Sequence, residues 1–272
     1  MSKRPFYVGY QPNAPVTVGR YLRPRLLGVI VIAALVAVLI PLSASRYAAS
    51  GFEFGTTRMF AGVLSEHPYP TLLVPRPGKH DGMPYSRYLL VAPGKFGLQA
   101  LTNGLKGRRV ELQGTVIHRD DHTMIEVVPE SLKVGAADAT VTSQPEALGN
   151  VTLRGEIVDS KCYLGLMKPS TRKPHKACAI RCLAGGIPAI LVVTRPDGGT
   201  EHVILSDLDG RALNNRILDR VAEPVVVTGA LTRRGGDLIL MADPGDIRRV
   251  ASGPADDRRV QKNNNDGVHS AP

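Results

Sequence analysis

Two parts of the chain carry the same order of short apolar runs, and this order limits the folds available to it. In residues 60–134, three runs rich in Val, Ile and Leu precede a helix-like segment (95–107), and two more runs follow around a polar turn. Residues 153–250 show the same order, with the helix-like segment at 207–221. Runs of about four to eight residues with β-branched side chains, bounded by turn residues, are typical of strands. The chain of 272 residues, with 28 Gly and 21 Pro, is therefore expected to be mainly β.

The order of elements in each part resembles an OB-fold, a small five-stranded barrel whose helix lies between its third and fourth strands. The resemblance rests on element order and covers most of residues 60–134 and 153–250. It implies two tandem OB-like five-stranded barrels, each with a short helix. Residues 46–134 would form the first domain and 151–250 the second, joined by the small and polar residues 135–150. Two unrelated β domains are the alternative.

The second part carries an insert that the first part lacks. From Gly62 to Gly114 the chain advances 52 residues, whereas it advances 74 between the matching Gly155 and Gly229. The surplus of 22 residues falls between the first two strands of the second part, within residues 160–188. Loops at the mouth of a barrel commonly carry binding or catalytic residues. Function is therefore expected in this insert.

The insert contains all three cysteines of the chain and one of its seven histidines. Pro174 suits the first turn of a helix and Gly185 suits its end, so the second half of the insert is predicted to be helical. On that helix His175, Cys178 and Cys182 stand at positions i, i+3 and i+7. Residues at this spacing face the same side of a helix.

A metal site is the first hypothesis for the insert. Cys162, His175, Cys178 and Cys182 form a Cys₃His set, which is an accepted ligand set for tetrahedral zinc. Soft thiolates also suit Cu(I), and the thioether of Met167 is a further candidate ligand for copper. The expected cofactor is therefore zinc or copper. Six basic residues of the insert would favour thiolates over thiols; they are Lys161, Lys168, Arg172, Lys173, Lys176 and Arg181.

A structural disulfide is the main alternative to the metal site. Cys162 paired with Cys178 or Cys182 would fasten the loop to the helix and stabilise the fold by roughly 3 kcal/mol. An odd number of cysteines leaves one thiol over. Thiol chemistry is the third hypothesis, although the C-x3-C spacing differs from the C-x2-C of thioredoxin-like proteins. These alternatives overlap, because a disulfide can be the oxidised form of a metal or redox site.

The insert also resembles a segment of short exported bacterial domains of unassigned function. The shared pattern is V-D-x-x-C-Y-L…H-x2-C-A-x2-C-x3-G-x-P, which residues 158–188 carry here. The resemblance implies an envelope protein in which Cys and His form the working set. It supplies no reaction.

A membrane anchor is predicted over residues 26–45. Residues 26–44 contain no charge over nineteen positions, and a helix of that length spans roughly 28 Å at about 1.5 Å per residue, close to the thickness of the bilayer core. Five basic residues and no acid occur in residues 1–25, against Arg46 and Arg58 beyond the span. The N-terminus is therefore expected in the cytoplasm and the rest of the chain in the periplasm, on a single-pass inner-membrane anchor.

A cleaved signal peptide, with Ser43-Ala44-Ser45 as its cleavage site, is the alternative for this segment. Half of the formal net charge of +10 lies in residues 1–25, so the exported part is only mildly basic and no nucleic-acid partner is expected. Residues 251–272 are polar and expected to be disordered.

Together these features predict a membrane-anchored accessory or assembly protein of the bacterial envelope, with a protein partner there. Its Cys/His insert would bind a metal or metallocofactor, or contact the partner. A structural interaction protein with a disulfide-stapled loop, or a thiol- or metal-dependent enzyme, is the alternative. No catalytic residues are assigned, because the histidines outside the insert stand singly or flank a turn.

Overall fold

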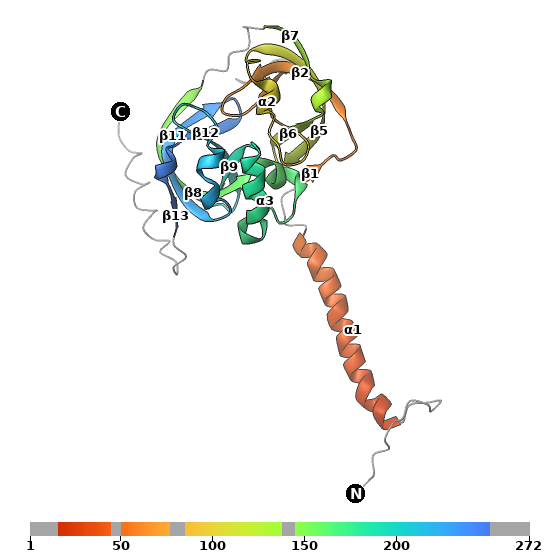
Figure 1. Cartoon of the computed structure of the whole chain (residues 1–272). Coiled ribbons are helices and arrows are strands. Elements are labelled where there is room, and N and C mark those ends of the chain that lie inside the picture. Colours follow the sequence, from red (N-terminus) through yellow and green to blue (C-terminus); the bar gives the residue numbers. More distant parts are fainter. Residues whose placement is uncertain (1–15, 45–49, 77–84, 138–144, 251–272) are drawn as a thin grey trace, which may run out of the picture. The chain divides into compact units, whose positions relative to one another are not determined.

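The computed structural model describes residues 16–44, 50–76, 85–137 and 145–250 (Figure 1). The chain forms two compact units that divide after Ala49. The first unit contains one long helix, α1 (Val16–Ala44), which begins ten residues before the predicted anchor. Its stretch Val16–Leu42 is long and apolar enough to cross a membrane, and the 18 most apolar consecutive residues in it have a mean hydropathy of 2.7. The predicted polar tail 251–272 lies outside the described residues.

The first barrel is a sheet that closes on itself. Its five strands are β2 (Arg58–Ser65), β3 (Thr71–Pro75), β4 (Tyr85–Val91), β5 (Arg108–Arg119) and β6 (His122–Val127). β2 pairs antiparallel with β3 and β5, β3 pairs with β4, and β4 runs parallel to β6. The β5–β6 hairpin closes the barrel. Two short strands, β1 (Ser50–Phe52) and β7 (Lys133–Ala137), also pair with β5, and a 3₁₀ turn, η1 (Pro129–Ser131), precedes β7.

The alternation of side chains along β5 shows why this segment forms a barrel strand. Val110, Leu112 and Val116 are buried in the core, whereas Glu111 and Gln113 between them are exposed. Successive side chains of a strand point to opposite faces, so a period of two places one set inside the barrel.

The second barrel repeats the five pairings among the barrel strands of the first. Its five strands are β8 (Glu146–Asp159), β9 (Ala189–Thr194), β10 (Thr200–Ser206), β11 (Pro224–Arg234) and β12 (Asp237–Met241). β8 pairs with β9 and β11, β9 with β10, β10 runs parallel to β12, and β11–β12 closes the barrel. A last strand, β13 (Ile247–Arg249), pairs with β11. The predicted fold class, mainly β with an N-terminal apolar helix and two five-stranded barrels, is confirmed.

Two glycines stand at corresponding places in the two barrels. A Cβ added to Gly62 on β2 would lie 2.4 Å from the carbonyl oxygen of Leu73. A Cβ added to Gly155 on β8 would lie 2.4 Å from the carbonyl oxygen of Val192. At each place the first strand therefore approaches its neighbour too closely for any side chain.

Gly155→Ala and Gly62→Ala are each expected to lower the free energy of unfolding by about 1–3 kcal/mol, the usual cost of overpacking. Chemical denaturation of the purified protein measures this. Gly199→Ala is the matched control, because its added Cβ would meet only the flexible guanidinium of Arg195. An unchanged stability in both barrel variants would contradict the close approach.

The segments between the third and fourth strands differ between the barrels. In the first barrel α2 (Gln99–Thr102) is a short helix. In the second barrel the segment 207–221 contains two 3₁₀ turns instead, η3 (Asn214–Arg216) and η4 (Leu218–Arg220). The side chain of Asp207 accepts hydrogen bonds from the backbone N–H groups of Asp209 and Arg211, which favours a turn over a helix at this point.

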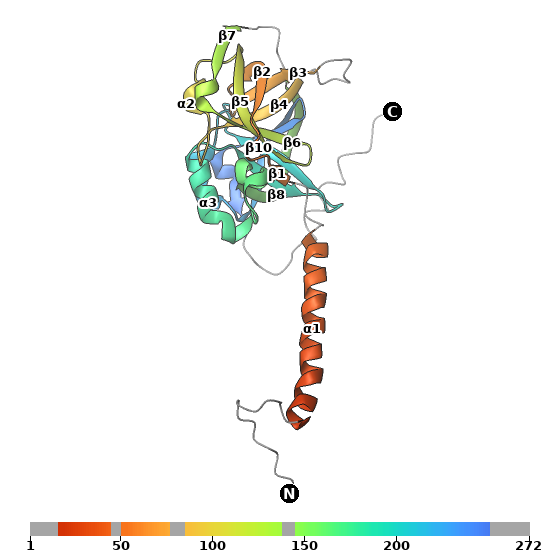
Figure 2. The same ribbon diagram turned by 90° about the vertical axis from the view of Figure 1, so that its right-hand side faces the viewer.

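The two barrels lie against each other (Figure 2) and are joined by buried polar contacts. Tyr69, between β2 and β3, is fully buried, and its hydroxyl donates to Asn214 Oδ1 of the second barrel at 2.7 Å. Arg87 on β4 pairs with Asp237 on β12, with Nε and Oδ2 2.6 Å apart. Residues of both barrels contribute to the larger hydrophobic core, and those from the first barrel include Tyr69 and Ile117.

Lys161 fastens the insert to the first barrel. Its side chain is fully buried, and Nζ donates to the carbonyl oxygens of Ala92 (2.9 Å) and Gly94 (2.8 Å). The same ammonium pairs with Glu126 on β6. A buried lysine is stable only when its charge is neutralised and its donors are satisfied, and these three oxygens meet that need.

Candidate metal centre

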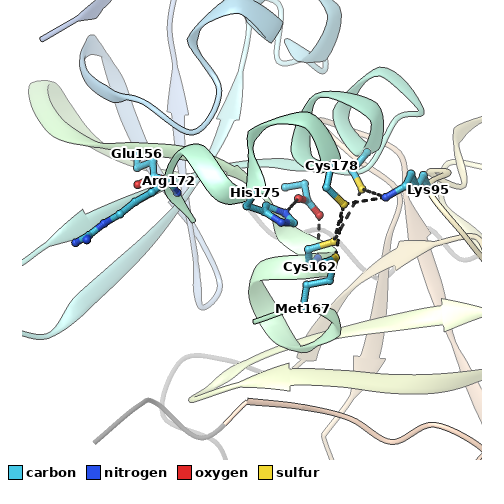
Figure 3. Close-up of polar contacts among 9 residues, drawn as sticks. Lys95, Glu156, Cys162, Met167, Arg172, His175 and Cys178 are labelled. Carbon is cyan, nitrogen blue, oxygen red and sulfur yellow. Dashed lines mark hydrogen bonds and ion pairs between the residues drawn. The ribbon is translucent and has the colours of Figure 1, made fainter. Parts of the chain in front are cut away.

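Three consecutive elements of the second barrel carry the candidate ligands. Asp159 ends β8, and Cys162 begins a single π-helical turn, η2 (Cys162–Leu166). The helix α3 (Arg172–Ala184) then presents Cys178 and Cys182, and Gly185 caps its end as the sequence predicts. In η2 and α3 the chain turns back on itself, so that Cys162 lies against the inner face of α3 (Figure 3).

The three cysteine sulfurs converge on one point. The Sγ atom of Cys162 lies 4.0 Å from Sγ of Cys178 and 4.0 Å from Sγ of Cys182. All three sulfurs lie within 4.8 Å of one another, an arrangement that could hold a metal ion. Cys162 and Cys182 are buried, whereas Cys178 is half-buried. All three cysteines are free, so the predicted disulfide stays a prediction.

Two further side chains complete the surroundings of the sulfurs (Figure 3). The thioether sulfur of Met167 lies 3.6 Å from Sγ of Cys178. The ammonium of Lys95 lies 2.8 Å from Sγ of Cys178 and 3.8 Å from Sγ of Cys182. Met167 is a predicted candidate ligand, but Lys95 belongs to the first barrel and is not one of the six predicted cations. The local sequence of the insert carries no signal for it, because Lys95 precedes Cys162 by 67 residues.

Two of the six predicted cations pair with carboxylates. Lys161 is buried on Glu126, and Lys176 pairs with Glu223. The other four are exposed on the insert; they are Lys168, Arg172, Lys173 and Arg181.

In the structure, the imidazole of His175 contacts the carboxylate of Asp159. Its Nε2 lies 2.8 Å from Oδ2 of Asp159, and both side chains are buried. The other oxygen of Asp159 accepts the backbone N–H of Cys162 at 2.8 Å. Asp159, Cys162 and His175 form a second group whose ligand atoms lie within 4.8 Å of one another. The predicted Cys₃His set is thus divided into two groups that share Cys162.

Asp159 is part of the motif in the sequence, but the spacing of Cys and His does not assign it a role. In the structure its carboxylate orients both His175 and the start of η2. Second neighbours that hold a ligand in place are a usual part of metal sites.

The sulfurs are in unequal electrostatic surroundings. The pKa of Cys182 is lowered, chiefly because the Cys162 thiol donates a hydrogen bond to its sulfur, with the charge of Lys95 adding to the effect. The same hydrogen bond, together with burial and the nearby Asp159, raises the pKa of Cys162. The pKa of Lys95 is raised, chiefly because its ammonium donates a hydrogen bond to the sulfur of Cys178. The cluster therefore favours a thiolate beside a cation, the state in which cysteine binds metals.

A group of rings packs around Tyr163, the residue that follows Cys162. Tyr163 packs edge-on against His202, with ring centroids 5.1 Å apart, and its hydroxyl lies 3.3 Å from His202 Nε2. The guanidinium of Arg119 lies 4.0 Å from the centroid of the Tyr163 ring, and His122 lies 4.3 Å from His202. In the sequence these histidines stand alone on a strand and at a turn. Only the packing of the two barrels brings them together.

The free energy of unfolding is expected to fall by on the order of 3 kcal/mol because of His202 as the pH falls from about 6.5 to 4. Burial, with the positive charges of His122 and Arg119, lowers the pKa of His202 to about 4. In that range the unfolded chain binds a proton at His202 that the folded protein does not, so this contribution is complete above pH 6.5 and is lost on acidification.

Denaturation curves recorded from pH 7 to pH 4 test this effect. His202→Gln should give a flatter stability profile than wild type, and His67→Gln, at an exposed histidine, should not. Parallel profiles for wild type and His202→Gln would contradict it.

Comparison of the chain with protein-family models, curated proteins and solved structures finds no match.

Proposed function

We propose that this protein is a membrane-anchored envelope protein that holds one Cu(I) ion on Cys162, Cys178 and Cys182, with Met167 as an additional ligand. The observation that carries the proposal is the convergence of three sulfurs within 4.8 Å of one another. Soft thiolate and thioether sulfurs are the ligands that select Cu(I).

The spacing of the sulfurs supports a shared metal ion. A metal about 2.3 Å from each of several sulfurs holds them about 3.8–4.0 Å apart. The two distances from Cys162 are 4.0 Å. A metal ion therefore requires little movement of the backbone that carries the thiols.

The surroundings favour copper over zinc. Met167 contacts Cys178, and a thioether is a usual ligand of copper but not of zinc. His175, the fourth zinc ligand predicted from the sequence, directs Nε2 to Asp159. Three thiolates with Cu(I) carry two negative charges, and the ammonium of Lys95 offsets one of them.

The anchor and the motif support a location of the site in the envelope. We place the N-terminus in the cytoplasm because of the basic residues before α1, and the barrels in the periplasm. The resemblance of residues 158–188 to exported bacterial domains agrees with this placement. The protein would act as an accessory or assembly factor that holds a metal ion for an envelope partner. If the apolar segment is a cleaved signal peptide, the same protein would be secreted without its anchor.

Metal titration of the reduced full-length protein in detergent, without oxygen, tests the proposal. We expect one Cu(I) per chain in a competition with a coloured Cu(I) chelator, and protection of all three thiols from alkylation on loading. One Zn²⁺ per chain with no Cu(I) would support the site and overturn the choice of metal. Two thiols lost to a disulfide, with no metal bound, would overturn the proposal.

Thiol–disulfide exchange is the second candidate function. Half-buried Cys178 beside Lys95 is the cysteine placed to attack a partner disulfide. Its thiolate would form a mixed disulfide and release one partner thiolate. The thiol of Cys162, after losing its proton, would then attack Cys178 and release the second, leaving Cys162–Cys178 oxidised and the partner reduced by two electrons. Reduction of one disulfide substrate per reduced chain that persists in Cys182→Ser would favour this function over metal binding.

A further inference from the structure

We propose that the opening of the thiol site is a docking surface for an acidic face of a partner protein, which exchanges Cu(I) directly with Cys178. The surface, here called the rim, consists of Lys95, Phe96, Met167, Lys168 and Arg181. This inference rests on the proposed function, because it names the kind of partner that the copper site would serve.

The exposure of the three cysteines shows where the site opens. Cys162 and Cys182 are each 1% exposed, so neither sulfur can be reached from solvent. Cys178 is half-buried and lies between the ammonium of Lys95 and the thioether of Met167. An incoming ligand would therefore meet Cys178 first.

Two exposed apolar side chains belong to the segments that carry this opening. Phe96 is 63% exposed and follows Lys95 in the chain, and Met167 is 41% exposed beside Cys178. Exposed aromatic and methionine side chains are enriched at protein–protein interfaces. The contact of Met167 with Cys178, and the place of Phe96 next to Lys95 in the chain, point to contact with a protein.

The two sides of the rim are fixed to each other. The N–H of Gly97 donates to the carbonyl oxygen of Gly185 at 2.9 Å, and Gln99 Nε2 donates to the carbonyl oxygen of Gly186 at 2.7 Å. A Cβ added to Gly185 would lie 1.9 Å from the carbonyl oxygen of Lys95. The loop of the first barrel and the end of α3 therefore form a preformed surface, which lowers the entropic cost of docking.

The charge of the rim indicates an acidic partner. Residues 160–188 contain no Asp or Glu. Lys95, Lys168 and Arg181 are exposed. A surface with charge of one sign speeds the approach of the opposite sign and repels the same sign. An anionic lipid surface is negatively charged like an acidic protein, but it offers no thiolate to bind a metal ion at Cys178.

The exchange itself needs no oxidant or reductant. A thiolate of the partner binds Cu(I) while the bond between Cu(I) and Cys178 breaks, and the remaining thiolates follow in the same way. Copper stays Cu(I) throughout, and any proton on the partner thiol moves to the released cysteine or to water.

Transfer of Cu(I) from the loaded full-length protein in detergent to two synthetic peptides tests the inference. Both peptides carry the same Cys-x-x-Cys pair, one flanked by four Glu and the other by four Lys. At low ionic strength we expect the acidic peptide to take Cu(I) about tenfold faster or more, and the ratio to approach one in high salt. The double variant Lys168→Glu/Arg181→Glu should remove or reverse this preference.

Arg154→Glu/Arg248→Glu is the matched control, because both arginines are exposed on the sheet β8–β11–β13 and the change in net charge is the same. It should keep the wild-type preference. Phe96→Ala should slow transfer to the acidic peptide, whereas Val134→Ala, at another exposed apolar residue, should not.

Equal transfer to both peptides, or a preference that both double variants lose alike, would overturn the docking surface while leaving the copper site intact. Loss of binding to anionic vesicles in the rim variant, with unchanged peptide transfer, would assign the rim to the membrane instead. Absence of Cu(I) from the purified protein after loading would overturn both proposals.

Discussion

Cys162→Ser is expected to weaken Cu(I) binding by at least 100-fold, or about 3 kcal/mol. Its sulfur is the one that lies 4.0 Å from each of the other two. A serine hydroxyl is a hard ligand with a high pKa and does not replace a thiolate on Cu(I). Cys178 and Cys182 would then offer two sulfurs only, spaced C-x3-C on one face of α3. Competition with a Cu(I) chelator at known affinity measures the loss.

The matched variants separate ligands from their supports. Met167→Leu should weaken binding by less than tenfold, because the three thiolates remain, and Met59→Leu, at an exposed methionine of β2, should have no effect. His175→Gln keeps an N–H donor for Asp159 and should keep most of the Cu(I) affinity. A loss in His175→Gln as large as in Cys162→Ser would show that the imidazole is a ligand and restore the Cys₃His set.

Lys161→Met is expected to lower the free energy of unfolding by about 3–5 kcal/mol, the range for removing one partner of a buried ion pair. The change leaves Glu126 without its cation and the carbonyl oxygens of Ala92 and Gly94 without their donor. For a domain of this size the midpoint of thermal unfolding should fall by about 10 °C. Calorimetry and chemical denaturation measure the two quantities.

Lys168→Met is the control for this change, since Lys168 is an exposed lysine of the same insert and surface substitutions usually stay within about 0.5 kcal/mol. Glu126→Gln in the Lys161→Met background should recover part of the loss, because the uncompensated carboxylate is then removed. Equal stabilities of Lys161→Met and Lys168→Met would show that the buried contact does not stabilise the junction.

Much of the architecture could be predicted from local patterns. Alternating apolar runs such as Val110, Leu112 and Val116 determine which face of β5 enters a core, and this depends only on neighbouring residues. Pro174 and Gly185 likewise determine where α3 begins and ends. At 207–221 the local pattern did not decide the outcome, because the side chain of Asp207 competes for the backbone donors that a helix would use.

The sequence by itself determined that the chain has an apolar helix, two barrels with the same strand order, and an insert whose helix directs Cys178 and Cys182 to one side. Only the tertiary structure decided that Lys95 of the first barrel lies at those sulfurs, that Lys161 is buried on Glu126, and that Asp159 pairs with His175. The physical reason is the separation along the sequence of the residues that make each contact. Strand and helix patterns arise from contacts between near neighbours in the chain, whereas the charge and the opening of the site depend on how the two barrels pack.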